Sequence, residues 1–226
     1  MRGFFMAPYH EEELKMSETD VRNNTIARGE RRGVASAKWI AKTGVLSAVA
    51  IALMYLEISL PLFPVFLKFD FSEIPALLAA FAMGPLAGIA VELVKNLAHL
   101  PATHTMMVGE LANFIMGSCF VGVAGLIYRY KKTRKGAMIS MAAGTVALTA
   151  SGAIINYFLT IPFYISAMGF TLDKIVEMTR MAGNTLVHDL PTLILWVFVP
   201  FNILKGVVVS LIVWLIYKKL SPLLHR

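Results

Sequence analysis

The chain has 226 residues, of which 57% are hydrophobic and only 15% are charged, and its formal net charge is +7. A soluble domain of this length needs more polar surface, so we predict an integral membrane protein. The uneven placement of the positive charge argues against nucleic-acid binding, and the single cysteine, Cys119, excludes a disulfide within the chain.

The first 37 residues are polar, with an acidic run at residues 11–13 that is followed by several arginines. A cleavable signal peptide would place a short basic start before an apolar core, and this segment lacks that order. We therefore expect residues 1–37 to form a cytoplasmic tail and residues 38–222 to form one membrane domain.

Six apolar segments follow the tail, and each is expected to be a transmembrane helix. A straight crossing needs about 20 residues, so the second and third segments should tilt, join at Gly84-Pro85 or form a re-entrant bend. Pro162 and Pro200 should kink or end the long fifth and sixth segments. The six segments are 39–60, 72–83, 85–100, 108–129, 137–165 and 190–217.

Lysine and arginine predict the orientation of these segments. Eight lie in the stretch up to Lys42, five lie between residues 129 and 135, and three lie at the C-terminal end. With six spans, these three regions share one side of the membrane, which must be the cytoplasm. The expected fold is an all-α bundle of six transmembrane helices with both termini cytoplasmic.

A charged stretch framed by prolines, residues 61–73, joins the first two segments. It carries Lys68, Asp70 and Glu73, which alternate with phenylalanines. A solvated connecting loop would explain any single charge. Three charges next to membrane segments are costly and usually functional, so we interpret the stretch as a loop that folds over a pocket.

Polar side chains of the later segments should gather in the outer half of the bundle. Asn202 and Lys205 lie three residues apart on one helix face, and Asn156 and Asn113 are expected at a similar depth. Interhelical hydrogen bonding would explain Asn113 alone. A buried lysine with no partner on its own helix instead favours an outward-facing pocket for a polar, partly aromatic small molecule.

Two other patterns have structural explanations of comparable weight. On the third segment, Glu92 and Lys95 are three residues apart, and interhelical bonding is the favoured interpretation of this pair. On the first segment, Gly44, Ala48 and Ala52 recur every four residues and could serve either internal packing or the docking of another membrane subunit.

Catalytic and metal-binding motifs are missing from the sequence. There is no phosphate-binding loop, no H-E-x-x-H, no G-x-S-x-G and no cysteine pair, and we see no inverted repeat. His188-Asp189 is best interpreted as a helix cap, because no second ligand shares its spacing. We therefore predict no catalytic residues and no metal site.

Four stretches together are similar to a known family. They are LKFDFSEIPALL at 67–78, GPLAG at 84–88 running into ELVKN at 92–96, GELANF at 109–114 and PFNILKG at 200–206. The chain resembles the riboflavin-specific substrate-binding subunits of energy-coupling-factor (ECF) transporters, and the resemblance covers residues 38–222. Its N-terminal tail departs from the short start that the family has.

The resemblance implies a six-helix bundle in a prokaryotic cell membrane that binds riboflavin from outside, as a transported ligand and with no cofactor of its own. Uptake would need a transmembrane coupling subunit, contacted by small residues of the first helix (here Gly44, Ala48 and Ala52), and two cytoplasmic ATPases. The loop after the first helix would cover the flavin. The expected ligand-binding residues are Lys68, Asp70, Glu73, Asn113, Asn156, Asn202 and Lys205.

Two alternatives remain open at this point. A subunit of the same architecture could bind another vitamin, such as thiamine or a pantothenate-like acid, and a thiamine site would need extra carboxylates, for which Glu92 and Glu110 are candidates. An intramembrane enzyme or a structural scaffold is the other class. Glu57 has no evident catalytic partner in the sequence, which disfavours the enzyme.

Overall fold

The structure is a computed structural model that describes the backbone of residues 36–224 and the side chains of residues 36–216. Residues 1–35 of the expected tail therefore lie outside the described part, and so do the side chains of the C-terminal lysines. The chain divides into a first unit that ends at Lys42 and a second that begins at Thr43. Of the first unit the structure describes only residues 36–42, the start of the helix Ser36–Met54, and all packing below belongs to the second unit.

Four helices within residues 36–216 are long and apolar enough to cross a membrane. They are Ser36–Met54, Val108–Tyr130, Arg134–Ala167 and Leu190–Ile216. The prediction of an α-helical membrane protein is confirmed at this level. The first helix ends at Met54 and not at residue 60, because the chain there turns into a short β-hairpin.

The second and third apolar segments are short helices, α2 (Glu73–Met83) and α3 (Pro85–His99). They meet at Gly84, whose φ of 99° suits glycine, and Pro85 occupies the first turn of α3, where a missing N–H costs little. Packing of α2 against α3, α4 and α9 buries eight of its residues, Glu73 among them. A join at Gly84-Pro85 was one of the three arrangements expected from the sequence, and it is present in the structure.

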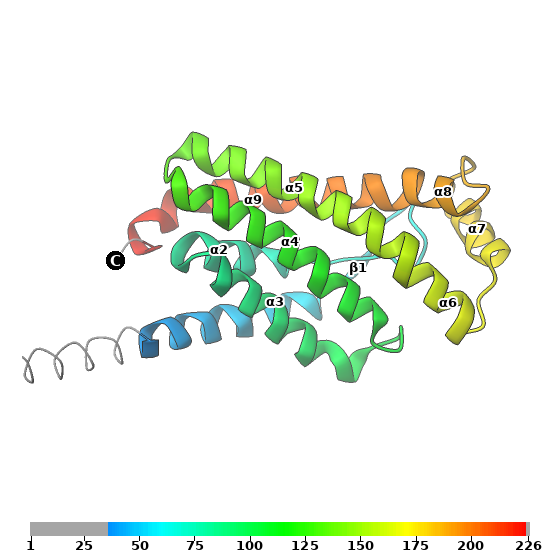
Figure 1. Ribbon diagram of the computed structural model, residues 1–226, viewed down its shortest axis with the longest axis horizontal. Helices are drawn as coiled ribbons and strands as arrows, with labels where there is room; N and C mark the ends of the chain where they lie inside the picture. Colours follow the sequence, from blue (N-terminus) through cyan, green and yellow to red (C-terminus); the bar gives the residue numbers. More distant parts are fainter. Residues whose placement is uncertain (1–35, 225–226) are drawn as a thin grey trace, which may run out of the picture. The chain divides into compact units, whose positions relative to one another are not determined.

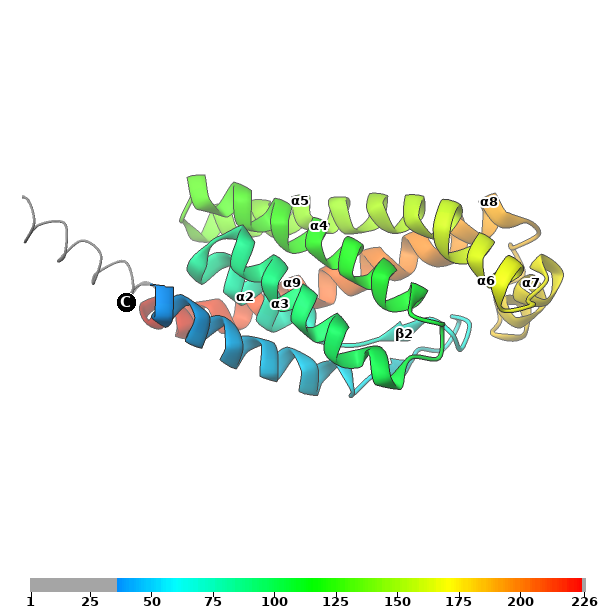
Figure 2. The same ribbon diagram turned by 60° about the horizontal axis from the view of Figure 1, so that its bottom comes forward.

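Helix α4 (Val108–Tyr130) packs along α5 (Arg134–Ile155), and the two lie side by side in both views (Figures 1 and 2). The hydroxyl of Thr133 caps α5 by accepting a hydrogen bond from Gly136 N at 3.0 Å. A core of small and aromatic side chains lies among α2, α3, α4, α5 and α9. Its largest members include Leu77, Phe81, Phe120, Tyr128 and Leu148.

Two widened, π-helical turns interrupt the long helices just before their prolines. The elements are α5, η2 (Asn156–Thr160) and α6 (Ile161–Ala167), and then α8 (Leu190–Leu193), η3 (Ile194–Phe198) and α9 (Val199–Leu224). Proline lacks an N–H and clashes with the carbonyl four residues earlier, and a wider turn removes that clash. Pro162 and Pro200 therefore do not end their helices.

A short amphipathic helix that the sequence did not predict, α7 (Leu172–Met181), lies at the end of the bundle where α6 ends and α8 begins (Figure 1). Its buried residues Ile175 and Val176 join a second apolar cluster with Ile161 and Leu193. Its other face carries charged side chains, and so its hydropathy resembles that of a loop.

The connection between the first helix and α2 forms a small antiparallel hairpin. Strand β1 (Ile58–Ser59) pairs with β2 (Lys68–Phe69), with Ile58 opposite Phe69. Phe63 and Phe66 in the intervening loop pack on the second apolar cluster. The predicted fold-back of this stretch is present, and its phenylalanines hold it against the second apolar cluster.

Candidate functional site

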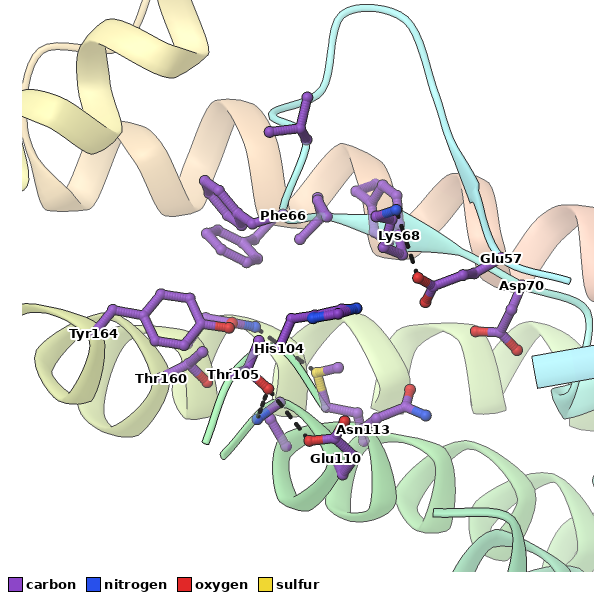
Figure 3. Close-up of a pocket in the computed structure, with 18 of the residues that line it drawn as sticks. Glu57, Phe66, Lys68, Asp70, His104, Thr105, Glu110, Asn113, Thr160 and Tyr164 are labelled. Carbon is purple, nitrogen blue, oxygen red and sulfur yellow. Dashed lines mark hydrogen bonds and ion pairs between the residues drawn. The ribbon is translucent and has the colours of Figure 1, made fainter. Parts of the chain in front are cut away.

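A cavity of about 420 Å³ lies between the hairpin and helices α4, α6, α7 and α9 (Figure 3). Six of the seven predicted ligand residues line it, namely Lys68, Asp70, Asn113, Asn156, Asn202 and Lys205. Glu73 does not line it, because this side chain is fully buried beneath the cavity. The six residues, which span the chain from Lys68 to Lys205, thus lie around one cavity.

Asparagine side chains form one wall of the cavity. Asn156 Nδ2 donates to the Gly152 carbonyl at 2.8 Å, and Asn202 Nδ2 donates to the Phe198 carbonyl at 2.9 Å. Asn113 Nδ2 donates to Asn96 Oδ1 at 3.1 Å. Asn156 Nδ2 also lies 3.8 Å from Met116 Sδ. The N–H groups thus hold the three amides in place, and their oxygens remain to accept from a ligand.

The position of Asn202 depends on a close approach between α5 and α9. A Cβ on Gly152 would lie 2.5 Å from Asn202 Nδ2, so any larger residue would displace the amide. The π-helical turn η2 begins at Asn156, four residues after Gly152, and π-helical turns often mark functional sites. The local helix geometry thus presents both amides to the cavity.

Beside the asparagines, Lys205 is held by two carboxylates from the hairpin side. Its ammonium lies 3.0 Å from Asp70 Oδ2 and 3.0 Å from Glu73 Oε1. Asp70 also accepts hydrogen bonds from the Ser72 backbone N–H and hydroxyl. Burial tends to raise the pKa of Asp70, but Lys205, Lys95 and Ser72 outweigh burial and lower this pKa below its usual value.

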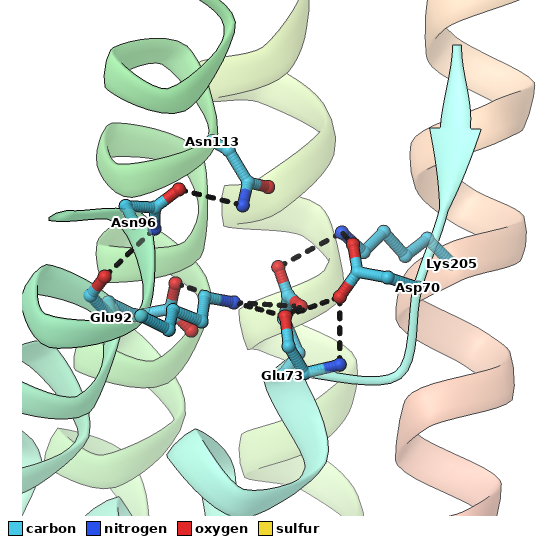
Figure 4. A network of polar contacts seen from close by, with 8 residues as sticks. Asp70, Glu73, Glu92, Asn96, Asn113 and Lys205 are labelled. Atoms are coloured by element: carbon cyan, nitrogen blue, oxygen red, sulfur yellow. Dashed lines mark hydrogen bonds and ion pairs between the residues drawn. The ribbon is translucent and has the colours of Figure 1, made fainter. Parts of the chain in front are cut away.

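The ion network continues away from the cavity to Lys95 (Figure 4). Lys95 Nζ lies 3.0 Å from Glu73 Oε2, 2.9 Å from Glu92 Oε2 and 2.7 Å from Ser72 Oγ. The side chains of Lys95, Glu73 and Glu92 are fully buried. These contacts agree with the structural interpretation of Glu92 and Lys95. The partners that Lys205 lacks on its own helix are Asp70 and Glu73, and Glu73 links the two lysines.

An aromatic wall lies beside the polar one. The Phe66 ring of the hairpin lies 6.3 Å from the Tyr164 ring and 6.4 Å from the Phe198 ring, between centroids. Phe63 packs edge-on against Phe201 at 5.2 Å and ties the hairpin loop to α9. Flat, apolar ligands suit such a wall.

A third region of the lining was not among the expected riboflavin-binding residues, and only Glu110 was named there, as a candidate for the thiamine alternative. Glu110, in the first turn of α4, accepts from Thr103 and Thr105, and His104 lies nearby on the cavity wall. Glu57 also lines the cavity and pairs with Lys68 at 3.5 Å. The T-H-T stretch at 103–105 just before a helix was the available signal, and it was overlooked because its hydroxyls look like ordinary helix caps.

The small-residue stripe on the first helix lies apart from the cavity lining. Gly44, Ala48 and Ala52 are exposed, and a Cβ on Gly44 would meet no atom within 4 Å. Ser47 and Ala50 of the same helix are buried. Within the described second unit, internal packing therefore does not use the stripe.

These features together define a class of protein, a helical membrane protein with a small-molecule site in one half of its bundle. The chain belongs to the family of ECF transporter substrate-specific components, whose family model matches residues 38–217. It is similar to a riboflavin transporter RibU of Staphylococcus aureus (strain TCH60), with 35% identity over 80% of this chain and 89% of that protein.

Two further comparisons agree with this assignment. The chain is 34% identical to a riboflavin transporter FmnP of Bacillus subtilis (strain 168), over 84% of this chain and 95% of that protein. A solved structure of the S component of a bacterial ECF transporter superposes with a TM-score of 0.66 at 32% identity, and the match covers 84% of this chain and 99% of the other.

Proposed function

We propose that this chain is the riboflavin-binding subunit of an ECF transporter and mediates riboflavin uptake. The observation that carries the proposal is the cavity in which three asparagines and Lys205 face an aromatic wall beneath a phenylalanine-rich hairpin. The names of the similar transporters of S. aureus and B. subtilis support the choice of ligand. Riboflavin is the transported ligand, and we propose no resident cofactor.

The chemistry of the cavity suits a flavin. The pyrimidine edge of the isoalloxazine ring alternates carbonyl acceptors with an imide N–H, and asparagine can match both while Lys205 donates. The dimethylbenzene end needs apolar surface, which Phe66, Tyr164 and Phe198 offer. Lys68 and Asp70 would contact ligand from the hairpin, and Glu73 would act through Lys205. Because the lysines pair with carboxylates, the site suits an uncharged vitamin.

The full topology belongs to this proposal as well. All six predicted segments cross a prokaryotic cell membrane, α2 and α3 as short helices, and both termini are cytoplasmic. The basic connection 129–135 joins α4 to α5 at the end of these helices remote from Glu110 and Asn156, and positive charge favours the cytoplasmic side. The cavity then opens to the outside.

Transport requires partners in this proposal, because the sequence has no phosphate-binding loop of its own. A transmembrane coupling subunit would dock on the exposed stripe of Gly44, Ala48 and Ala52, where small residues allow close helix approach. Two cytoplasmic ATPases would then drive uptake. Membership in the family of substrate-specific components supports this division of labour.

The ligand can be tested on purified protein. Protein prepared in detergent should be yellow and should release flavin on denaturation, and flavin-free protein should quench riboflavin fluorescence on titration. Thiamine and pantothenate serve as controls in the same binding assay. Colourless protein that leaves riboflavin fluorescence unchanged would refute the proposal. Tighter binding of thiamine or pantothenate than of riboflavin would show that the site binds another vitamin.

A further inference from the structure

We propose that Glu110 and the turn that holds it form a separate subsite for the polyhydroxylated side chain of the ligand, and that the Glu110 carboxylate excludes ligands phosphorylated at the end of that chain. The inference rests on the proposed flavin-binding function and deepens it. It assigns a specificity-determining role to a region that the sequence did not associate with riboflavin.

The cavity provides three chemically distinct regions, and a flavin has three chemically distinct parts. The amide wall suits the pyrimidine edge, and the aromatic wall suits the fused rings. The remaining lining includes Glu110, Thr105, His99 and His104, which combine acceptors with hydroxyl and imidazole groups. A ribityl chain presents several hydroxyls, each both donor and acceptor, and matches this mixture.

Glu110 is held firmly in place. Its carboxylate accepts from Thr103 Oγ1 at 2.8 Å and from Thr105 Oγ1 at 3.2 Å, and His99 Nδ1 lies 3.1 Å from its other oxygen. The side chain is 7% exposed. Figure 3 shows Glu110 and Thr105 across the cavity from Phe66 and Lys68. The carboxylate is thus positioned before a ligand arrives.

The turn before α4 adopts an unusual backbone to achieve this arrangement. Met106 and Met107 have φ of 49° and 70°, a left-handed conformation that methionine rarely adopts. Thr103 Oγ1 accepts from Met107 N at 3.2 Å and from Thr105 N at 3.2 Å, so the hydroxyls that donate to Glu110 also fix the turn. Strain of this kind tends to occur at ligand-binding sites.

The charges in this region decide which chain ends are accepted. Glu57 is paired with Lys68, whereas the three groups that contact Glu110 are two hydroxyls and an imidazole. No lysine or arginine among residues 36–216 pairs with Glu110, so no permanently charged cation offsets its carboxylate. A hydroxyl can donate to this carboxylate, but a phosphate would bring like charges together away from bulk water.

Three ligands separate these roles in fluorescence-quenching titrations: riboflavin, riboflavin 5′-phosphate, and lumiflavin, which has a methyl group in place of the ribityl chain. We expect Glu110→Ala to weaken riboflavin binding about tenfold and to leave lumiflavin binding unchanged. Equal weakening of both ligands, or of neither, would overturn the polyol subsite.

The charge effect is tested with Glu110→Gln, which keeps hydrogen-bonding capacity without the charge. The ratio of the Kd for the phosphate ester to the Kd for riboflavin should fall about tenfold or more. The control is Glu177→Gln, which removes an equal charge from the exposed face of α7 and should leave the ratio unchanged. An unchanged ratio in Glu110→Gln would contradict the exclusion role.

If the Glu110 variants do not fold, Thr105→Val provides the second route. It keeps the carboxylate and removes one donor, so it should weaken riboflavin more than lumiflavin, and equal effects on the two ligands would count against the subsite. Wild-type protein that binds no riboflavin at all would refute the proposed function itself, and the two failures are therefore distinguishable.

Discussion

The ammonium of Lys205 lies 3.0 Å from the carboxylate of Asp70, although the two residues are 135 positions apart. Lys205 belongs to α9 and Asp70 follows strand β2 of the hairpin, so their ion pair connects the hairpin to α9 across the cavity lining. Because Asp70 and Lys205 are both nearly buried, this pair belongs to the class in which loss of one partner is costly.

The first prediction concerns this pair. Lys205→Met should lower the free energy of unfolding by about 3–5 kcal/mol, because Asp70 and Glu73 would lose a buried counter-ion. Thermal unfolding of flavin-free protein in detergent measures the effect. The double variant Asp70→Asn with Lys205→Met should recover part of the loss, and a single variant as stable as the wild type would contradict the network.

The second prediction concerns Gly152. A Cβ there would lie 2.5 Å from Asn202 Nδ2, so Gly152→Ala should push the amide aside and weaken flavin binding about tenfold. Gly122→Ala is the matched control, because its Cβ would meet its nearest neighbour, Ile89, at an ordinary 3.6 Å. Equal riboflavin affinities of the two variants would show that Asn202 does not depend on this close approach.

The third prediction concerns the carbonyl of Trp196, four residues before Pro200. Proline has no N–H to donate, and Asn184 Nδ2 donates to this carbonyl at 3.0 Å instead. Asn184→Asp cannot donate in this way and should cost about 1 kcal/mol of stability. Chemical or thermal unfolding of flavin-free protein measures this loss. Asp173→Asn on the exposed face of α7 is a suitable control, and equal stabilities of the two variants would argue against the bond.

The fourth prediction concerns pH. Asp70 precedes α2, and its pKa is lowered in the folded protein, since its ionic and hydrogen-bonding partners outweigh burial. A carboxyl whose pKa is lower in the folded state contributes stability above its unfolded pKa of about 4, and this contribution is lost as the pH falls. The Tm difference between wild type and Asp70→Asn should therefore be constant from pH 5 to pH 8.

Below about pH 4 the same difference should shrink, because protons then compete with Lys205 and Ser72 for the Asp70 carboxylate. A series of thermal melts in detergent at fixed ionic strength provides the measurement. A difference that instead shrinks between pH 6 and pH 8 would mean that a different group controls the stability of the hairpin attachment.

The fifth prediction separates binding from transport. Ala48→Leu on the exposed stripe should leave riboflavin affinity unchanged and should abolish uptake into cells that contain the complete transporter, because a bulky residue prevents close helix approach. Val45→Leu, also exposed on this helix, is the control. Normal uptake by Ala48→Leu would show that the stripe does not contact the coupling subunit.

Much of the helical framework could be predicted, because long apolar segments and the Gly84-Pro85 join are local features of the sequence. The pairing of Lys205 with Asp70 and Glu73 could not be predicted, since it joins residues distant along the chain. Glu73 was expected at the ligand, yet its position in the first turn of α2 directs it into the network below. The hairpin was missed because two-residue strands leave almost no periodicity to detect.

The amide residues were found because an asparagine inside an apolar helix is conspicuous. Glu110 was noticed only as a candidate for a thiamine site, because its position depends on the turn at Met106 and Met107. Both residues are in a left-handed conformation that methionine does not predict. The widened turns before Pro162 and Pro200 could likewise be predicted only in part. Proline predicts an irregularity in the helix, and the surrounding packing decides whether the helix kinks, ends or forms a π-helical turn.

Those two turns also set the rotational phase of the helices that follow them. Successive residues of an α-helix are about 100° apart around its axis, so deletion of one residue from η3 would rotate everything beyond it by that angle. Asn202 and Lys205 would then leave the cavity together, with no substitution at either position. The length of η3 is therefore as much a requirement for ligand capture as the identity of the residues it aligns.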